Sequence, residues 1–117
     1  MISGVHALMF SRDADAVRKF LRDVLELDSI DAGDGWLIFT LPPAELGVHP
    51  TDEAPHHELY LMCDDVEESV ARLSAKGVRF DGDGEIITAR FGKVATMLLP
   101  DGSKLAMYEP HHARAVR

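Results

Sequence analysis

Hydrophobic and polar residues alternate most clearly over residues 57–63 of the chain. A period of two residues is typical of a strand that buries one face. Leu59, Leu61 and Cys63 fall on one face of this segment, and Glu58 falls on the other. The pattern therefore predicts a strand in which Glu58 points to the side opposite these three residues.

A helical period follows directly, over residues 65–76. Val66 and Val70 share one face of that helix, as expected for a helix that packs on a core. Asp65 is followed three residues later by Glu68, which is the spacing of a capping box. A glycine directly after the segment suits a helix end that needs a left-handed backbone. The sequence therefore predicts a strand and a capped helix in succession.

The remaining segments repeat this order. A second helix is expected to begin at Asp13, with Val17 and Phe20 on its apolar face. Strands are expected at residues 2–10, 27–32, 36–41 and 44–49 in the first half, and at residues 79–88, 93–99 and 104–109 in the second half. Each half then contains a strand, a helix and three strands, with residues 51–55 as the linker. The chain is therefore expected to contain two copies of one structural unit.

Length, composition and net charge limit the classes of protein to which the chain can belong. The length of 117 residues is sufficient for one domain and too short for two independent domains. No run of 18 apolar residues occurs, so no membrane span is expected. A formal net charge of −8 repels phosphate backbones, so nucleic acid is not an expected partner. Cys63 is the single cysteine and the start of the chain lacks a secretory signal, which indicates the cytoplasm and an inert, buried thiol.

Four segments carry more specific features, in a fixed order: residues 6–13, 58–66, 91–95 and 99–105. Together they resemble the vicinal oxygen chelate superfamily, which includes glyoxalase I, bleomycin-resistance proteins, fosfomycin-resistance enzymes and extradiol dioxygenases. The resemblance implies an α+β fold in which two βαβββ modules form curled mixed sheets around a cleft, with the helices on the outer face. Residues 1–117 would then be a single domain, made of module 1–53 and module 54–117.

The resemblance also implies a metal site. In the superfamily, a divalent metal sits in the cleft and is held by residues from the first and last strands of both modules. His6 and Glu58 occupy the two first-strand positions. Gly47 and Ala106 occupy the two last-strand positions, and neither has a side chain that can bind a metal.

Strand alternation supplies further candidates near these positions. Two residues beyond each missing ligand, on the same face, stand His49 and Tyr108. His6, His49 and Glu58 would then hold the metal, since imidazole and carboxylate donors suit zinc, iron, manganese or nickel. Glu58, as ligand or base, and Tyr108, as proton donor or orienting group, are the catalytic candidates. By the same parity Glu109 points the other way and is not expected to be a ligand; no organic cofactor is expected.

Simpler interpretations of the same residues stay open. His6 is also explained as a hydrogen-bonded residue that lines the cleft. Glu58 is also explained by an ion pair with Arg90, and His49 by exposure to solvent. The other histidines of the second half are expected to be exposed: His56, His57, His111 and His112.

Two functions follow from these alternatives. The first is a small metal-dependent enzyme of isomerase, lyase or dioxygenase type, acting on a small oxygen-rich substrate by Lewis-acid stabilisation. The second is a metal-free protein of the bleomycin-resistance type, which binds and sequesters a small organic molecule. In either case the expected partners are a small molecule and a second copy of the chain, because strongly curved sheets leave edges that pairing protects.

Overall fold

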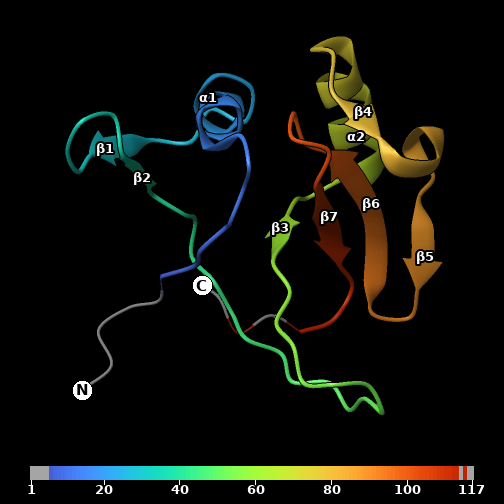
Figure 1. Ribbon diagram of the computed structural model, residues 1–117. Helices are drawn as coiled ribbons and strands as arrows, with labels where there is room; N and C mark the ends of the chain where they lie inside the picture. The colour runs from blue at the N-terminus through green and yellow to red at the C-terminus, as the bar shows by residue number, and fades with distance from the viewer. Residues whose placement is uncertain (1–5, 114, 116–117) are drawn as a thin grey trace.

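The computed structural model describes residues 6–113 and residue 115. This part of the chain is a mixed α+β structure, which confirms the predicted class (Figure 1). Its elements, in chain order, are α1 (Ala14–Asp23), β1 (Ser29–Asp31), β2 (Leu37–Phe39), β3 (Tyr60–Met62), α2 (Val66–Ala75), β4 (Arg79–Phe80), the 3₁₀ turn η1 (Asp81–Gly84), β5 (Ile87–Ala89), β6 (Gly92–Leu98) and β7 (Lys104–Pro110). Neither α1 nor α2, the two helices of the described residues, has the length and apolar character needed to cross a membrane.

The second half of the chain forms one five-stranded sheet. Its strand order is β3-β7-β6-β4, and β5 also pairs with β6. β3 runs parallel to β7, and the other pairs are antiparallel. The β6–β7 hairpin is the longest pairing, from Gly92 opposite Pro110 to Leu98 opposite Lys104. The first half contributes a separate two-stranded sheet of β1 and β2.

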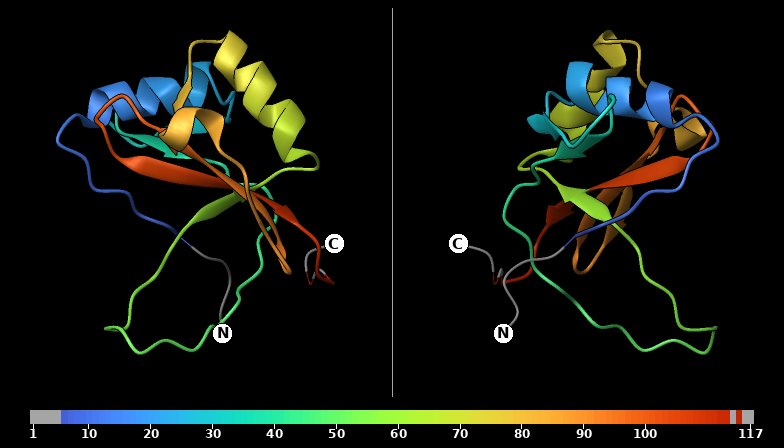
Figure 2. Two further views of the ribbon diagram at one scale, coloured as in Figure 1. Left: turned by 90° about the vertical axis from the view of Figure 1, so that its right-hand side faces the viewer. Right: turned by 60° about the vertical axis from the view of Figure 1, so that its left-hand side comes forward.

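Both helices lie over one face of the large sheet, and no helix of the described residues lies on the opposite face (Figure 2). The buried residues of β6 and β7 alternate along each strand and pack with α1 and α2: Ala95, Met97, Leu105 and Met107 with Val17, Phe20 and Val66. The residues between them in register point to the other side. We call this side the helix-free face, and its members are Tyr60, Met62, Val94, Thr96, Ala106 and Tyr108.

Both helices begin at an aspartate that accepts a backbone hydrogen bond. Asp13 accepts one from the first turn of α1. Asp65 Oδ1 accepts from the N–H of Glu68 at 3.1 Å, which confirms the predicted cap. The Glu109 carboxylate of β7 accepts from the N–H of Val66 at 2.9 Å and ties the start of α2 to the sheet. These bonds satisfy N–H groups that have no partner inside a helix.

The prediction of strands was wrong in three places. Residues 6–10 of the first predicted strand, and residues 44–49, have irregular backbone, while residues 1–5 lie outside the described part of the chain. An alternating pattern assigns faces to a strand, but the strand also needs a neighbour for its hydrogen bonds. Residues 79–88 are divided into β4, η1 and β5 because Gly82 and Asp83 adopt φ of 59° and 54°. The division into modules 1–53 and 54–117 stays a prediction.

Candidate functional site

Five aromatic rings gather at the helix-free face: His49, Tyr60, Phe91, Tyr108 and His112. We call them the aromatic cluster. Tyr108 is central, with ring centroids 6.0 Å from Tyr60, 6.0 Å from Phe91 and 5.7 Å from His112, the last in a stacked arrangement. His49 meets Phe91 edge to face at 6.5 Å. Rings from five separate places in the sequence therefore share one surface.

Gly92 explains why the Tyr108 ring can lie where it does. A Cβ atom built on Gly92 would lie 2.7 Å from Cε1 of Tyr108 and would also overlap the carbonyl oxygen of Glu109. Only glycine leaves this space open. The Tyr108 hydroxyl then donates to the carbonyl oxygen of Phe91 at 2.9 Å, which holds the ring over the β6–β7 hairpin.

Glu58 stands beside the Tyr60 end of the cluster. Its carboxylate accepts a hydrogen bond from the Tyr60 hydroxyl at 2.7 Å and lies 3.3 Å from Nε2 of His56. The bond from Tyr60, followed by that from His56, lowers the pKa of Glu58, so the group stays anionic. Arg90, the partner considered from sequence, is not among its hydrogen-bond or ion-pair partners.

Glu45 stands at the opposite end of the cluster. One carboxylate oxygen accepts from the N–H of Ala115 at 2.7 Å, and the other lies 3.9 Å from Nε2 of His112. Burial raises the pKa of Tyr108, and the charge of Glu45 raises it further. Carboxylates therefore flank the aromatic cluster on two sides.

The structure brings together some of the predicted site residues. His49 and Tyr108 belong to the aromatic cluster, and the charge of His49 contributes to the lowered pKa of Glu58. His6 is exposed in irregular backbone and makes no hydrogen bond or ion pair within residues 6–113 and residue 115. Over the described part of the chain, His6, His49 and Glu58 are not a set whose possible ligand atoms lie within 4.8 Å of one another, and a metal site at these residues stays a prediction.

A compact group of possible metal donors lies elsewhere. Over the described part of the chain, the one set of three with ligand atoms within 4.8 Å of each other is Asp65, Glu67 and Glu109. Existing partners account for these carboxylates: Lys93 Nζ donates to Glu67 at 2.9 Å, and Glu109 is bonded to the start of α2 and to His111. Glu109 points away from Tyr108, as strand alternation predicts. This acidic set ties α2 to the sheet.

Solved structures match the chain over most of its length, although no protein-family model and no curated protein matches it. TnmS3, an antibiotic binding protein from Streptomyces sp. CB03234, has a TM-score of 0.63 and 24% sequence identity, with 94% of this chain and 99% of that chain covered. A lactoylglutathione lyase from Agrobacterium tumefaciens has a TM-score of 0.64 and 16% identity, with 92% and 93% covered. A glyoxalase/bleomycin resistance protein/dioxygenase superfamily member from Sphaerobacter thermophilus has a TM-score of 0.61 and 18% identity, with 92% and 97% covered.

The chain has the vicinal oxygen chelate fold. The resemblance seen in sequence is confirmed at the level of the fold. Within this vicinal oxygen chelate fold, the position where a last-strand ligand is expected is Ala106, on the helix-free face opposite Tyr60 in register. The corresponding position in the first half, Gly47, is exposed in irregular backbone.

Four residues at the aromatic cluster were not among the site residues predicted from the sequence: Tyr60, Phe91, His112 and Glu45. Tyr60 could have been found, because alternation puts it on the same face as Glu58. Phe91 and His112 gave no periodic signal, since one lies in a turn and the other follows the last strand. Glu45 reaches the cluster only through the path of an irregular segment.

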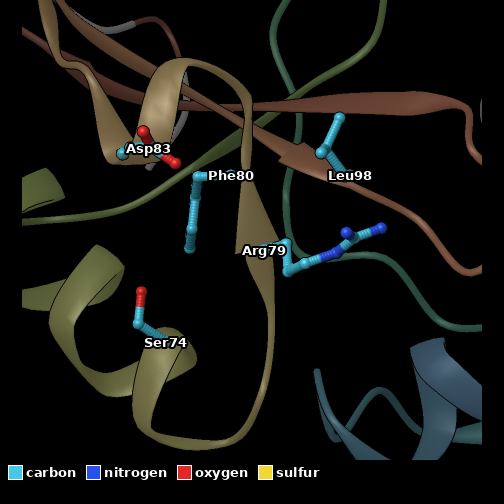
Figure 3. A pocket seen from close by; sticks show the side chains of 6 residues that line it. Ser74, Arg79, Phe80, Asp83 and Leu98 are labelled. Carbon is cyan, nitrogen blue, oxygen red and sulfur yellow. The ribbon is translucent and has the colours of Figure 1, made fainter.

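Two hollows lie elsewhere on the molecule, and none of the predicted site residues lines them. The first, of about 310 Å³, opens between α2, β4 and η1 and is lined by Ser74, Arg79, Phe80, Asp83, Gly84 and Leu98. Figure 3 shows the Phe80 ring directed toward Ser74, whereas the Arg79 side chain extends away from it. The second, of about 450 Å³, shares Arg79 and Leu98 and reaches Phe20 of α1. They mark the gaps between the helices and the edge of the sheet.

Cys63 is half-buried rather than fully buried as expected. Burial raises the pKa of its thiol, and the neighbouring Ser69 side chain offsets this only in part. The thiol is therefore protonated at neutral pH, which agrees with an inert role.

Proposed function

We propose that the chain is a small-molecule binding protein that uses the helix-free face as its binding surface. The aromatic cluster is the observation that carries this proposal. Tyr60 is 44% exposed and Phe91 is 48% exposed, so these rings face solvent although apolar groups gain by leaving it. Binding surfaces for small molecules are typically lined by such rings with a few polar groups among them.

The small residues of the site support the same proposal. Ala106 carries only a methyl group and lies next to Tyr60 and Tyr108 on the helix-free face. Tyrosine rings beside such a small side chain offer stacking surface to a planar molecule. A solved structure of the same fold is named an antibiotic binding protein, which agrees with a sequestering role.

The test is a titration followed by backbone amide NMR shifts. The probe is anthracene carrying a hydroxymethyl group, which is planar and uncharged. We expect the largest shifts at Tyr60, Phe91 and Tyr108, and little change at Val17 on the helix side. A Tyr60→Leu variant should weaken binding, whereas Ile30→Ser, which changes an exposed apolar residue of β1 in the separate two-stranded sheet, should not. Shifts centred on the helix side, or equal affinity in both variants, would overturn the proposal.

A metal-dependent enzyme of lyase or dioxygenase type is the second candidate. It is favoured by one observation, which is that the charge of His49 is among the causes that lower the pKa of Glu58. His6, His49 and Glu58 would hold zinc, iron, manganese or nickel, and the ion would supply Lewis-acid stabilisation of a developing negative charge. These three residues are not a set whose possible ligand atoms lie within 4.8 Å of one another in the described part of the chain, so this candidate ranks below simple binding.

We also propose that the protein is a homodimer. Its accessible surface is 9126 Å², whereas a folded monomer of this mass exposes roughly 6,300 Å². Its radius of gyration is 15.1 Å, against about 13.4 Å for a compact domain of this length. The excess surface is similar to what an obligate interface buries. Phe10 is 92% exposed and Leu46 and Val48 are each 89% exposed, so apolar side chains contribute to it.

The edge of the large sheet offers a place for such a partner. β3 is the last strand of the order β3-β7-β6-β4, so one of its sides has no neighbouring strand among the described residues. An unpaired strand edge is a template for pairing with a second chain. A partner strand there would lie next to Tyr60 and the helix-free face.

A reducing compartment such as the cytoplasm is the proposed location. The chain has one cysteine and so cannot form an internal disulfide. The raised pKa of the half-buried Cys63 thiol also disfavours exchange with an external disulfide.

A further inference from the structure

The aromatic cluster lies between two anionic groups. Glu58 is bonded to the hydroxyl of Tyr60 at one end, and Glu45 lies beside His112 at the other. Tyr108, between them, contacts both Tyr60 and His112. A ligand that stacks along these rings would meet a carboxylate at either end.

One cationic side chain of the β6–β7 pair, Lys93, is turned away from this surface. Lys93 belongs to the opposite face of β6 and donates to Glu67 of α2 at 2.9 Å. The whole chain carries a formal net charge of −8. The two carboxylates beside the cluster and the overall charge of the chain therefore both favour a positive group on the ligand.

We propose that the aromatic cluster selects planar aromatic molecules that carry a positive charge, an inference that rests on the proposed binding function. The face of a tyrosine or phenylalanine ring is the negative end of its quadrupole, so it attracts a cation as well as another ring. The His56 ring now lies at hydrogen-bond distance from the Glu58 carboxylate. A protonated amine on the ligand would replace this ring as a hydrogen-bond donor to the carboxylate. Rings and carboxylates together define the ligand class.

The test uses three probes that share one ring system and a methylene spacer and differ in charge: anthracene carrying an aminomethyl group, a hydroxymethyl group or a carboxymethyl group, the last a carboxylate. Fluorescence titration at low salt gives the dissociation constant of each. We expect the aminomethyl probe to bind at least about tenfold more tightly than the carboxylate probe, which corresponds to about 1.4 kcal/mol. Glu58→Gln and Glu45→Gln should each reduce this preference. Glu85→Gln removes one negative charge at a distance from the cluster and should leave it unchanged.

Different results would separate this inference from the proposed function. If the three probes bind equally and Tyr60→Leu abolishes this binding, the charge preference is overturned. The proposed site for planar molecules is then supported. If Glu85→Gln reduces the preference for the aminomethyl probe as much as Glu58→Gln and Glu45→Gln do, the preference comes from the net charge of the chain. That result would overturn a specific role for the two carboxylates. Binding of no probe, or binding that Tyr60→Leu does not alter, would overturn the binding function itself.

Discussion

At the scale of single residues, Gly92 and Tyr108 share one small space at the edge of the β6–β7 hairpin. The ring of Tyr108 and the carbonyl of Glu109 fill the position that a side chain at residue 92 would occupy. Because the aromatic cluster is built around Tyr108, the absence of one methyl group at Gly92 sets the geometry of the whole site.

Gly92→Ala should therefore destabilise the fold by about 1–3 kcal/mol, because the added methyl overlaps Tyr108 and backbone. Urea unfolding measures the free energy, and the near-UV circular dichroism of the tyrosines should change as well. Gly102→Ala is the control, since Gly102 has φ of 85° but no neighbour within 4 Å. That change strains only the backbone and should leave the tyrosine signal intact. An unaltered tyrosine signal in Gly92→Ala would contradict the explanation.

The metal hypothesis is also decided at single residues. Calorimetric titration of zinc, manganese and nickel ions into the wild type, His6→Ala, His49→Ala and Glu58→Ala tests it directly. If an ion binds at the predicted ligands, loss of Glu58 should weaken binding more than loss of His49, because only the carboxylate carries a full negative charge. Binding should also weaken below about pH 6, where a protonated imidazole can no longer donate a lone pair. Equal binding by all four proteins, or none by any, rules the hypothesis out.

At the scale of elements, α2 is held at its start by two carboxylates from different places. Asp65 caps it from within its own segment, and Glu109 reaches it from β7. Asp65→Ala should cost about 1 kcal/mol of unfolding free energy, because one N–H of the first turn loses its acceptor. Asp64→Ala changes the neighbouring exposed aspartate and should have little effect in the same urea experiment. Equal losses in the two variants would argue against capping.

The turn between β6 and β7 predicts a pH dependence. Asp101 accepts hydrogen bonds from the hydroxyl of Ser103 at 2.6 Å and from that of Ser11 at 2.5 Å. These bonds, with one from the Ser103 N–H, lower the pKa of Asp101 to about 2. The folded-state pKa lies below the unfolded value of about 4, so the contribution is complete above about pH 4 and is lost as the pH falls toward 2.

Asp101→Asn should therefore destabilise the protein at pH 6 and lose much of that effect near pH 3, as urea unfolding at both values would show. Asp52→Asn, in the exposed segment between the two halves, should not show this difference. A wild type and an Asp101→Asn variant that differ equally at both pH values would contradict the proposed bonds.

At the scale of the whole molecule, the large exposed surface predicts association. Sedimentation at micromolar concentration should give about twice the chain mass of 12.9 kDa. Phe10→Ser should shift the protein toward monomer by removing an exposed apolar ring, while Lys19→Ser on α1 should not. A wild-type monomer at that concentration would reject the dimer.

Much of the second half of the fold was predictable from local patterns. The cap of α2 follows from an aspartate at the capping position. The opposite directions of Tyr108 and Glu109 follow from a period of 2 residues, which depends only on backbone geometry. The absence of a strand at residues 6–10 was not predictable in the same way. The alternation is present, but a strand forms only where a neighbouring strand accepts its hydrogen bonds, and no such neighbour occurs for this segment among the described residues.

The sequence by itself determined the α+β class, the order of most elements and the sides of the sheet to which Glu58 and Tyr108 belong. Each of these depends on residues close together in the chain. Only the tertiary structure decided that Phe91, Tyr108 and His112 meet, and that Glu45 lies beside them. Such contacts join segments whose separation in the sequence carries no period, so they are set by the pairing of β6 with β7 and by the path of the irregular segment that carries Glu45.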